Sequence, residues 1–450
     1  MKPSTRNPTI TVGALTLVAS AYGTIHHVPD SYPTIQGAID AAADSDTVLV
    51  RPGTYLEREI DFRGRAITVT GSAPTDSLIV AGTLVDAGGE GTVFYFHTLE
   101  DSSSVLQGLS ITGGNSPSYD VRGGGITCRP DSSPRIRRCI IRDNVSAHHG
   151  GGIRCFLAAP VIEECSIEGN LGANEGGGIH CDWSSPSFRN CAVRNNEASV
   201  GGGLSCFWLA EPEIVGCVID SNLALDRGGG VAWLYDSGGS MRRCVLRGNE
   251  AEKGGGGAEN QSSPEILECL IEGNLATDGG GFYLDDGEPR ISATDLVGNR
   301  ANHDGGAMRC LASTTLTDCT LIDNSAGSKG GVAAIGVYGN SGSLSMDHCT
   351  LVGSRADSRG DVFYAHYAGA TLTNCIVWHN GPDQLAEGYG FSTRIEYSDI
   401  QGGWPGEGNI DEDPKLCDAV CLECWSRSRL LGPRRLRGSA PMSPGPAIVS

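Results

Sequence analysis

The sequence contains 450 residues with a formal net charge of −20, and 65 of its residues are glycine. Seven of the 33 basic residues lie in two terminal segments without acids, 1–21 and 425–450, so the body between them has 26 basic against 53 acidic residues. Such a body repels nucleic acid and anionic membrane surfaces, and it repels polyuronates unless Ca²⁺ bridges the carboxylates.

Residues 1–21 have the pattern of a secretory signal peptide. Lys2 and Arg6 precede an apolar run from Ile10 to Ala19, and small residues suited to cleavage follow it. The run is too short to span a bilayer, and no later segment reaches the required length. We therefore expect an exported protein, secreted or held at the cell surface, without a transmembrane segment.

Residues 22–115 are predicted to form an N-terminal cap and irregular first coils. One face of a short helix consists of Ile35, Ala38, Ile39 and Ala42, spaced i, i+3, i+4 and i+7. A helix of this kind suits the open end of a repeat array, where core side chains and unpaired backbone would otherwise meet solvent. Thr47–Val50 is the first predicted strand, followed by less regular coils at 67–69, 78–80 and 93–96.

Residues 116–415 form a regular repeat. Its asparagines recur at steps of 25 to 27 residues, at Asn144, Asn170, Asn196, Asn222, Asn249, Asn274, Asn299 and Asn324. A glycine triplet opens most copies, as at Gly150 and Gly176. Such a short and regular period indicates a solenoid, in which each unit buries its apolar face only against its neighbours.

Within a copy the apolar spacing is two, as in strands. Ile153 and Cys155 alternate with Arg154, and two further short apolar sets follow before Asn170. Three short strands per turn, separated by polar corners, predict an all-β fold, a single-stranded parallel β-helix. Glycine suits a corner that needs positive φ, and asparagine tolerates the left-handed region and hydrogen-bonds along its own stack.

Equivalent positions on successive coils should stack like on like. One inward column reads Leu109, Cys139, Cys165, Cys191, Cys217, Cys244, Cys269, Thr294, Cys319, Cys349, Cys375 and Ser398. These twelve positions predict about twelve coils and a rod of roughly 50–55 Å at the usual strand spacing.

A second column holds Cys128, Cys155, Cys181, Cys206 and Trp233. The chain has 17 cysteines in all. Stacked buried thiols and disulfides across a coil are both open, and the columns favour thiols.

Two parts of the sequence resemble right-handed parallel β-helix proteins of the pectin-lyase-like superfamily. They are the stretch IQGAIDAAADSDTVLVRPGTY and the repeated coil GGGI-x-C … P-x-I-x-x-C-x-I-x-x-N. The repeats are also similar to those of polymorphic outer-membrane proteins. The resemblance covers roughly residues 24–415 and implies a right-handed solenoid. Because the matching residues are stacking and corner positions, it implies the fold and leaves the activity open.

Aromatic residues cluster where the first strand of neighbouring coils ends. Trp183, Trp208 and Tyr235 stand two places after the inward position, and Phe156 and Phe207 stand one place after it. Candidate catalytic acids in the same corner region are Asp182, Asp236, Asp285 and Asp286. A row of rings beside carboxylates suits sugar binding, and the competing interpretation is a corner stack that turns inward.

A second candidate row lies at the corner before the glycine triplets. It consists of His148, His149, Glu175, Asp226, Arg227, Glu252, Lys253, Asp278, His303 and Asp304. Its mixture of acids and bases is compatible with a polysaccharide lyase, but every solenoid corner is polar, and a solvated loop is the simpler interpretation. No complete polygalacturonase-type set, nucleophile elbow, zinc-protease motif or phosphate loop is present.

Residues 416–450 are predicted to be an irregular, disordered basic tail. Cys417, Cys421 and Cys424 are closely spaced but have no fourth ligand nearby, so we expect no zinc site there.

Two functions follow from these patterns. The first is an exported, non-catalytic rod that binds glycans at or outside the cell surface. The alternative is a carbohydrate-active enzyme, a polysaccharide lyase or glycoside hydrolase. Neither requires a cofactor, and Ca²⁺ is a possible ligand of either. The oligomeric state is open.

Overall fold

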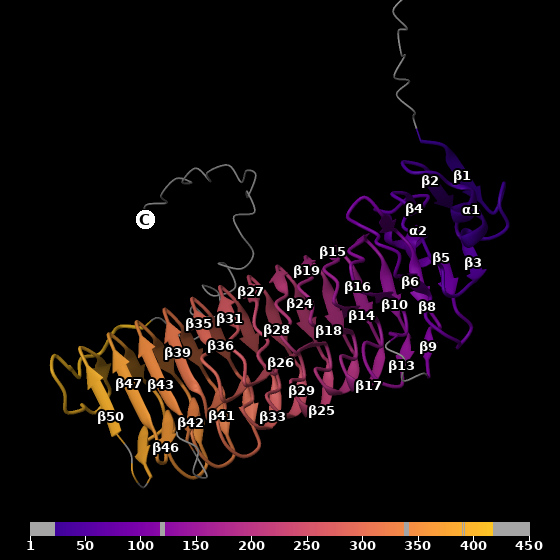
Figure 1. Ribbon diagram of the computed structural model, residues 1–450. Helices are drawn as coiled ribbons and strands as arrows, with labels where there is room; N and C mark the ends of the chain where they lie inside the picture. Colours follow the sequence, from indigo (N-terminus) through magenta and orange to yellow (C-terminus); the bar gives the residue numbers. More distant parts are fainter. Residues whose placement is uncertain (1–22, 118–121, 337–341, 389, 391, 417–450) are drawn as a thin grey trace, which may run out of the picture.

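The computed structural model describes residues 23–117, 122–336, 342–388, 390 and 392–416. They form an all-β, right-handed parallel β-helix of about fourteen turns, with strands stacked side by side along an elongated rod (Figure 1). Among these residues, no helix is long and apolar enough to cross a membrane. The largest sheet has 15 strands, which at about 4.8 Å per strand corresponds to a length of roughly 67 Å.

Sheet A and sheet B form two sides of each coil. Sheet A contains, in order, β1 Ile25–Val28, β2 Thr47–Val50, β4 Thr68–Gly71, β7 Val105–Gln107, β11 Arg135–Arg137, β15 Val161–Glu163, β19 Ser187–Arg189, β23 Glu213–Val215, β27 Ser240–Arg242, β31 Glu265–Leu267, β35 Arg290–Ser292, β39 Ser313–Thr317, β43 Ser343–Asp347, β47 Gly369–Thr373 and β50 Ser392–Glu396. Sheet B contains β3 Gly53–Leu56, β5 Thr83–Asp86, β8 Ser110–Thr112, β12 Ile140–Arg142, β16 Ser166–Glu168, β20 Ala192–Arg194, β24 Val218–Asp220, β28 Val245–Arg247, β32 Leu270–Glu272, β36 Asp295–Val297, β40 Thr320–Ile322, β44 Thr350–Val352, β48 Ile376–Trp378 and β51 Asp399–Ile400.

Sheet C and sheet D complete the coil. Sheet C contains β6 Phe94–Phe96, β10 Ile126–Cys128, β14 Ile153–Phe156, β18 Ile179–Asp182, β22 Leu204–Phe207, β26 Val231–Leu234, β30 Gly257–Asn260, β34 Phe282–Asp285, β38 Met308–Cys310, β42 Ala333–Ile335, β46 Phe363–Ala365 and β49 Leu385–Glu387. Sheet D contains β9 Asn115–Ser116, β13 Val145–Ser146, β17 Leu171–Glu175, β21 Glu197–Val200, β25 Leu223–Arg227, β29 Glu250–Lys253, β33 Leu275–Asp278, β37 Arg300–Ala301, β41 Ser325–Ala326 and β45 Arg355–Ala356.

Sheet D is a fourth ladder beyond the three strands per coil of the sequence pattern. Its inward positions hold small residues, such as Ala198 and Ala224, and the side chains on either side are partly exposed. Because a single alanine per strand produces no apolar alternation, the sequence pattern predicts a corner at this place and not a strand.

The N-terminal cap has the predicted helix, α1, at Ile35–Ala41, and Ile35, Ala38 and Ile39 are buried against the first coils. The Glu57 carboxylate accepts hydrogen bonds from the backbone N–H groups of Ile35 and Gln36 at 2.7 and 3.0 Å, which satisfies the helix N-terminus.

Two details of the first coils differ from the sequence prediction. β1 precedes Thr47–Val50 in sheet A, so the predicted first strand is the second. The predicted coil segment at 78–80 lies in a second short helix, α2 (Ser77–Ala81), which Asp76 caps by accepting from the backbone N–H of Leu78 at 3.0 Å. An aspartate N-cap offers the backbone a local alternative to a strand ladder.

A buried asparagine ladder runs along the corner between sheets B and D. The Nδ2 of Asn196 donates to Asn222 Oδ1 at 3.0 Å and to the carbonyl of Ile167 at 3.0 Å, and its backbone N–H also donates to Asn222 Oδ1. The same pattern repeats from Asn144 to Asn324. The predicted hydrogen bonding along the asparagine stack is confirmed.

The glycine triplets lie where sheet D turns into sheet C. Gly176 has φ +64°, and a Cβ on Gly178 would lie 2.6 Å from the carbonyl oxygen of Gly203 on the next coil. A side chain at Gly178 would therefore clash with the next coil, whereas farther along the rod the equivalent position holds Ala307 and Val332.

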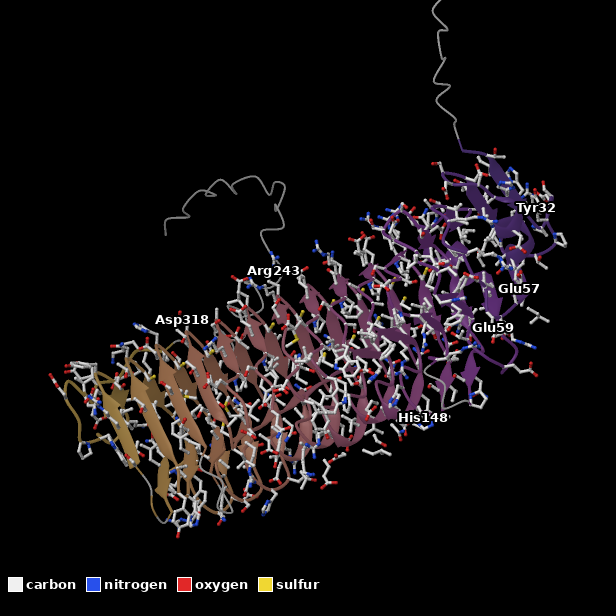
Figure 2. The ribbon with its side chains drawn as sticks, viewed as in Figure 1. Tyr32, Glu57, Glu59, His148, Arg243 and Asp318 are labelled. Carbon is white, nitrogen blue, oxygen red and sulfur yellow. The ribbon has the colours of Figure 1, made fainter. Side chains whose placement is uncertain are left out.

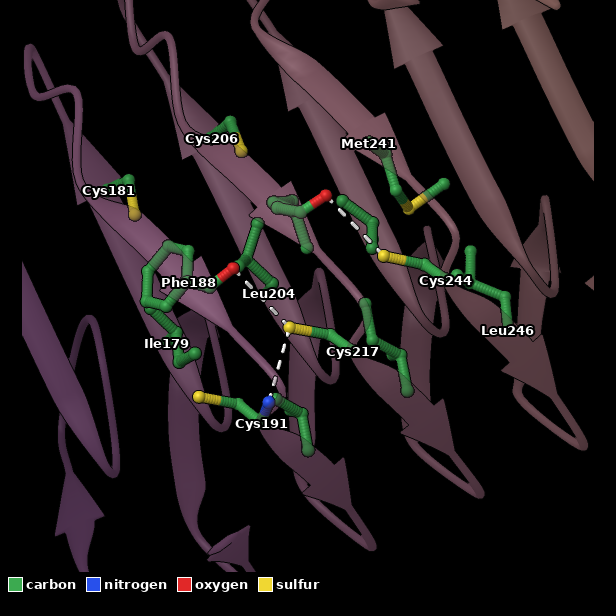
Figure 3. Close-up of a cluster of buried hydrophobic side chains, with 14 of the residues drawn as sticks. Ile179, Cys181, Phe188, Cys191, Leu204, Cys206, Cys217, Met241, Cys244 and Leu246 are labelled. Atoms are coloured by element: carbon green, nitrogen blue, oxygen red, sulfur yellow. Dashed lines mark hydrogen bonds between the residues drawn. The ribbon is translucent and has the colours of Figure 1, made fainter. Parts of the chain in front are cut away.

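Cysteines form the two predicted inward columns (Figure 3). All fourteen cysteines in the described part of the chain are buried free thiols. Each thiol of the long column contacts backbone carbonyls. Cys217 Sγ, for example, donates to the Phe188 carbonyl at 3.6 Å and accepts from the Cys191 N–H at 3.4 Å. These cysteines act as small core residues.

The corner between sheets A and B places a non-glycine residue in the left-handed region on most coils. Arg243 and Asp318 have φ values of +51° and +54° and lie along one long edge of the rod, opposite His148 (Figure 2). The sequence segments 1–21 and 417–450 lie outside the described residues, and so do the signal peptide and nearly all of the predicted tail.

Glu259 is a buried carboxyl in the inward sheet C column, between Trp233 and Leu284. Its carboxylate accepts from the backbone N–H groups of Ser262 and Asp285 at 2.7 and 3.0 Å. Burial nevertheless raises the pKa of Glu259 to about 8, because the core disfavours the charged form more than these bonds support it.

Replacing Asn222 with alanine should lower the free energy of unfolding by about 3 kcal/mol, because the Asn196 N–H and the Val193 carbonyl lose their partner inside the core. Chemical denaturation measures this change, with the exposed Asn174→Ala as control. Equal stability of the two variants would show that the ladder contributes little.

The free energy of unfolding should fall as pH rises from about 4.5 to 8, by up to about 1.4 kcal/mol per pH unit. The reason is that the folded protein holds the Glu259 proton more tightly than the unfolded chain does. Denaturation at several pH values should show a weaker fall in Glu259→Gln, whose side chain is neutral throughout. An identical pH slope in both proteins would contradict this assignment.

Candidate functional site

The outward surface of sheet C carries the candidate site. The strand residues that point outward form two columns in register. The first contains Arg154, His180, Ser205 and Ala232, and the second contains Phe156, Asp182, Phe207 and Leu234. We call this surface the sheet C face.

The first outward column is buried although it points away from the core. Arg154, His180 and Ser205 are 3%, 1% and 0% exposed. The glycine corner folds over them, and a Cβ on Gly176 would lie 2.8 Å from the Cβ of His180. Polar side chains in this column therefore occupy a largely desolvated site at the surface of the rod.

The five predicted aromatic residues lie together at one edge of the sheet C face. Trp183, Trp208 and Tyr235 are 46%, 44% and 36% exposed, and each adopts positive φ at the strand end. The Trp208 and Tyr235 rings are parallel with centroids 4.9 Å apart. Phe156 packs against Trp183 at 6.3 Å, and Phe207 meets Tyr235 edge-on at 4.8 Å. The three corner rings therefore point outward and do not form an inward corner stack.

The predicted acids are not gathered at one point. Asp182 lies in the second outward column, Asp236 follows Tyr235 at the exposed corner, and Asp285 and Asp286 lie two coils beyond Leu234. Asp182 and Asp285 are thus four coils apart, roughly 19 Å. This separation exceeds the distance between the paired carboxyls of a glycoside hydrolase, so Asp182 and Asp285 do not form such a pair.

Asp182 lies next to the buried basic residues. Arg154 Nη2 is 3.8 Å from Asp182 Oδ2. Burial raises the pKa of Asp182 and lowers the pKa of Arg154 to about 10, so both groups are perturbed mainly by desolvation. Burial, with Arg154 nearby, also lowers the pKa of His180 well below its ordinary value, which favours the neutral imidazole at pH 7.

The corner before the glycine triplets adds two groups on the other side of His180. His149 and Glu175 occupy paired positions on successive coils, and His149 Nδ1 contacts Glu175 Oε2. The His149 and His180 rings stack with centroids 4.8 Å apart. His180 Nδ1 forms a hydrogen bond with Ser205 Oγ at 2.7 Å.

A second cluster uses the same positions farther along the rod. Arg309 Nη1 lies 3.1 Å from both Asp278 Oδ1 and Asp304 Oδ2, and His303 Nδ1 lies 3.2 Å from Asp278 Oδ1. The side chain of Asp304 is fully buried. Here one guanidinium lies between two carboxylates and offsets part of their mutual repulsion.

Other members of the predicted corner row form ion pairs. Asp226 contacts Arg227 at 3.0 Å and Lys253 at 3.3 Å. This charge balance is typical of a structural corner.

A pocket of about 400 Å³ lies elsewhere, between α2 and the corner of sheets A and B. Its polar residues Arg138 and Glu164 form an ion pair at 2.8 Å. Because these charges satisfy each other, the pocket offers less chemistry than the sheet C face.

Arg154, His180 and Ser205 were missed as site residues by the sequence analysis. They stand between two inward residues, a position that predicts exposure to solvent. The glycine three places before each strand is the available signal, because it places the preceding corner directly over that position.

The comparisons with known proteins identify the family. Residues 95–225 and 213–377 match the family model described as the right-handed beta helix region. The chain belongs to this family. No curated protein has a sequence that matches this β-helix protein.

Solved structures similar to this β-helix protein include the catalytic unit of a thermostable GH87 alpha-1,3-glucanase from Streptomyces thermodiastaticus strain HF3-3. The two sequences are 14% identical and the TM-score is 0.46. The match covers 87% of this chain and 69% of the glucanase chain. The mannuronan C-5 epimerase AlgE6 A-module of Azotobacter vinelandii has 15% identity and a TM-score of 0.35, with 84% and 96% covered. The tailspike receptor binding domain of siphovirus 9NA has 10% identity and a TM-score of 0.31, with 88% and 78% covered.

Replacing Arg309 with alanine should lower the free energy of unfolding by about 3 kcal/mol or more, because Asp278 and Asp304 lose the cation between them. Adding Asp278→Asn and Asp304→Asn should restore part of the loss. Thermal and chemical denaturation measure both effects, with the exposed Arg243→Ala as control. No rescue by the asparagines would show that Arg309 acts through packing alone.

Proposed function

We propose that this β-helix protein is an exported rod that binds glycans through the aromatic edge of the sheet C face. The observation that carries the proposal is the outward placement of Trp183, Trp208 and Tyr235 on three successive coils. Exposed indole and phenol rings in register cover the apolar faces of sugar rings, while neighbouring carboxylates accept hydrogen bonds from hydroxyl groups.

The position of these rings supports a binding role. The corresponding corner position on other coils holds Leu157, Gln261 and Asp286, all with positive φ. The coil geometry therefore accepts polar, aliphatic and aromatic residues there, and it does not require a ring for stability.

Charge indicates the glycan class. The body has 26 basic against 53 acidic residues, and Asp182 and Asp236 lie beside the rings. An anionic polysaccharide would be repelled unless Ca²⁺ linked the carboxylates, so neutral glycans are the preferred ligands.

The second candidate function is a carbohydrate-active enzyme acting on the same bound glycan. The observation that favours it is the group of buried, perturbed ionisable residues Asp182, Arg154 and His180 next to the rings. A buried carboxyl with a raised pKa is the kind of group that donates a proton in general acid catalysis.

Replacing Trp208 with alanine should weaken binding of a neutral polysaccharide by about tenfold or more, equivalent to roughly 1.4 kcal/mol, because the stacked pair with Tyr235 is lost. The melting temperature should stay nearly unchanged, since the ring is outside the core. Affinity electrophoresis on a panel of neutral and acidic polysaccharides, with and without Ca²⁺, measures the binding.

Tyr397→Ala is the matched control, since Tyr397 is also exposed and has positive φ at another corner. Retention by the wild type that persists in Trp208→Ala would overturn the aromatic platform. The wild type could instead release new reducing or unsaturated ends from the polysaccharide, and Asp182→Asn could lose this activity. That result would establish an enzyme in place of a non-catalytic binding rod.

A further inference from the structure

Three potential metal ligands meet beside the sheet C face. His149 lies at the corner before β14, Glu175 lies at the corner before β18, and His180 lies within β18. One ligand atom from each falls within 4.8 Å of the other two. Two imidazoles and one carboxylate are a ligand set that Zn²⁺ accepts, with further positions left for water.

The surroundings of His180 suit metal binding. Its Nδ1 is held by Ser205 Oγ at 2.7 Å, and both residues are at most 1% exposed. With Ser205 accepting from Nδ1–H, Nε2 is the nitrogen left to bind an ion. Metal-binding histidines commonly donate their other ring N–H in this way, which sets the tautomer and the ring orientation.

The second cluster provides a comparison within the same molecule. Asp278, Asp304 and Arg309 occupy the positions of His149, Glu175 and His180, each at the corner before a glycine triplet or within the following strand. In that cluster the Arg309 guanidinium supplies the positive charge between the two corner residues. At the first cluster this position holds an imidazole, which offers a lone pair in place of a cation.

Two further charged residues, Arg154 and Asp182, lie near the site. Arg154 is the adjacent cation, and Asp182, 3.8 Å away, is its counter-charge. Glu175 therefore contributes the net negative charge facing His149 and His180.

We propose that His149, Glu175 and His180 form a binding site for a divalent transition-metal ion, with Zn²⁺ as the preferred ion. Ser205 is a positioning residue that orients His180. The site is independent of the proposed glycan binding, because none of its ligands belongs to the aromatic edge.

The experiment is equilibrium dialysis of the metal-free full-length protein against Zn²⁺ alone, without glycan. We expect one bound equivalent in the wild type that is lost in His180→Ala and in Glu175→Gln. Glu175 is only partly buried, so Glu175→Gln keeps the shape of the corner and should fold normally. Ser205→Ala should retain the ion with an affinity about tenfold weaker.

His303→Ala is the matched control, since it removes a histidine from the equivalent corner while Arg309 stays in place. Replacing Zn²⁺ by Co²⁺ should give the visible spectrum of nitrogen and oxygen ligands without thiolate charge transfer. Three outcomes would overturn the proposal. Zinc binding could survive both His180→Ala and Glu175→Gln, or it could disappear when Cys417, Cys421 and Cys424 are changed to serine. The third outcome is that the wild type binds no detectable zinc.

Discussion

The stacking of one coil directly on the next, at normal strand spacing, is the constraint on which the structure depends. At the two corners that flank sheet D it brings the backbones of successive coils close together, so most residues there are glycines or asparagines whose amides are hydrogen-bonded. Gly178 has no side chain, and a Cβ added there would lie only 3.0 Å from Asn196 Nδ2. The amide of Asn196 pairs with the coils on both sides. The shared period of glycine and asparagine follows from this contact.

The same stacking forces outward residues into columns, where like charges become neighbours. Asp278 and Asp304 are held together by Arg309. The basic residues that follow, Lys329 and Arg359, both lie over the Tyr364 ring, at 4.7 and 5.7 Å from its centroid. The residue that faces each of these two pairs, Arg309 or Tyr364, belongs to the first outward column of sheet C, which the glycine corner covers. His149 and Glu175 form the pair in which this position is an imidazole, and there we place the metal ion.

The proposed glycan site and the proposed metal site therefore share an origin. The corner before each sheet C strand folds back and buries the first outward column, while the corner after the strand leaves its aromatic rings exposed. Desolvation perturbs Arg154, His180 and Asp182, and exposure leaves Trp183 and Trp208 available to a ligand. A rod of simple repeats thus places buried ionisable groups beside accessible aromatic rings, an arrangement that favours recognition of an extended, repetitive polymer.

The sequence by itself determined the β-helix, the asparagine ladder, the cysteine columns and the helix at Ile35–Ala41, because these depend on spacing and on which side chains face the core. It also located the aromatic row, although whether Trp208 pointed in or out depended on the left-handed backbone at the strand end. Only the tertiary structure decided that Arg154 and His180 are buried, that Asp182 and Asp285 are four coils apart, and that His149 faces Glu175. These outcomes depend on how the glycine corner folds over sheet C, a contact between parts of the coil that local alternation does not record.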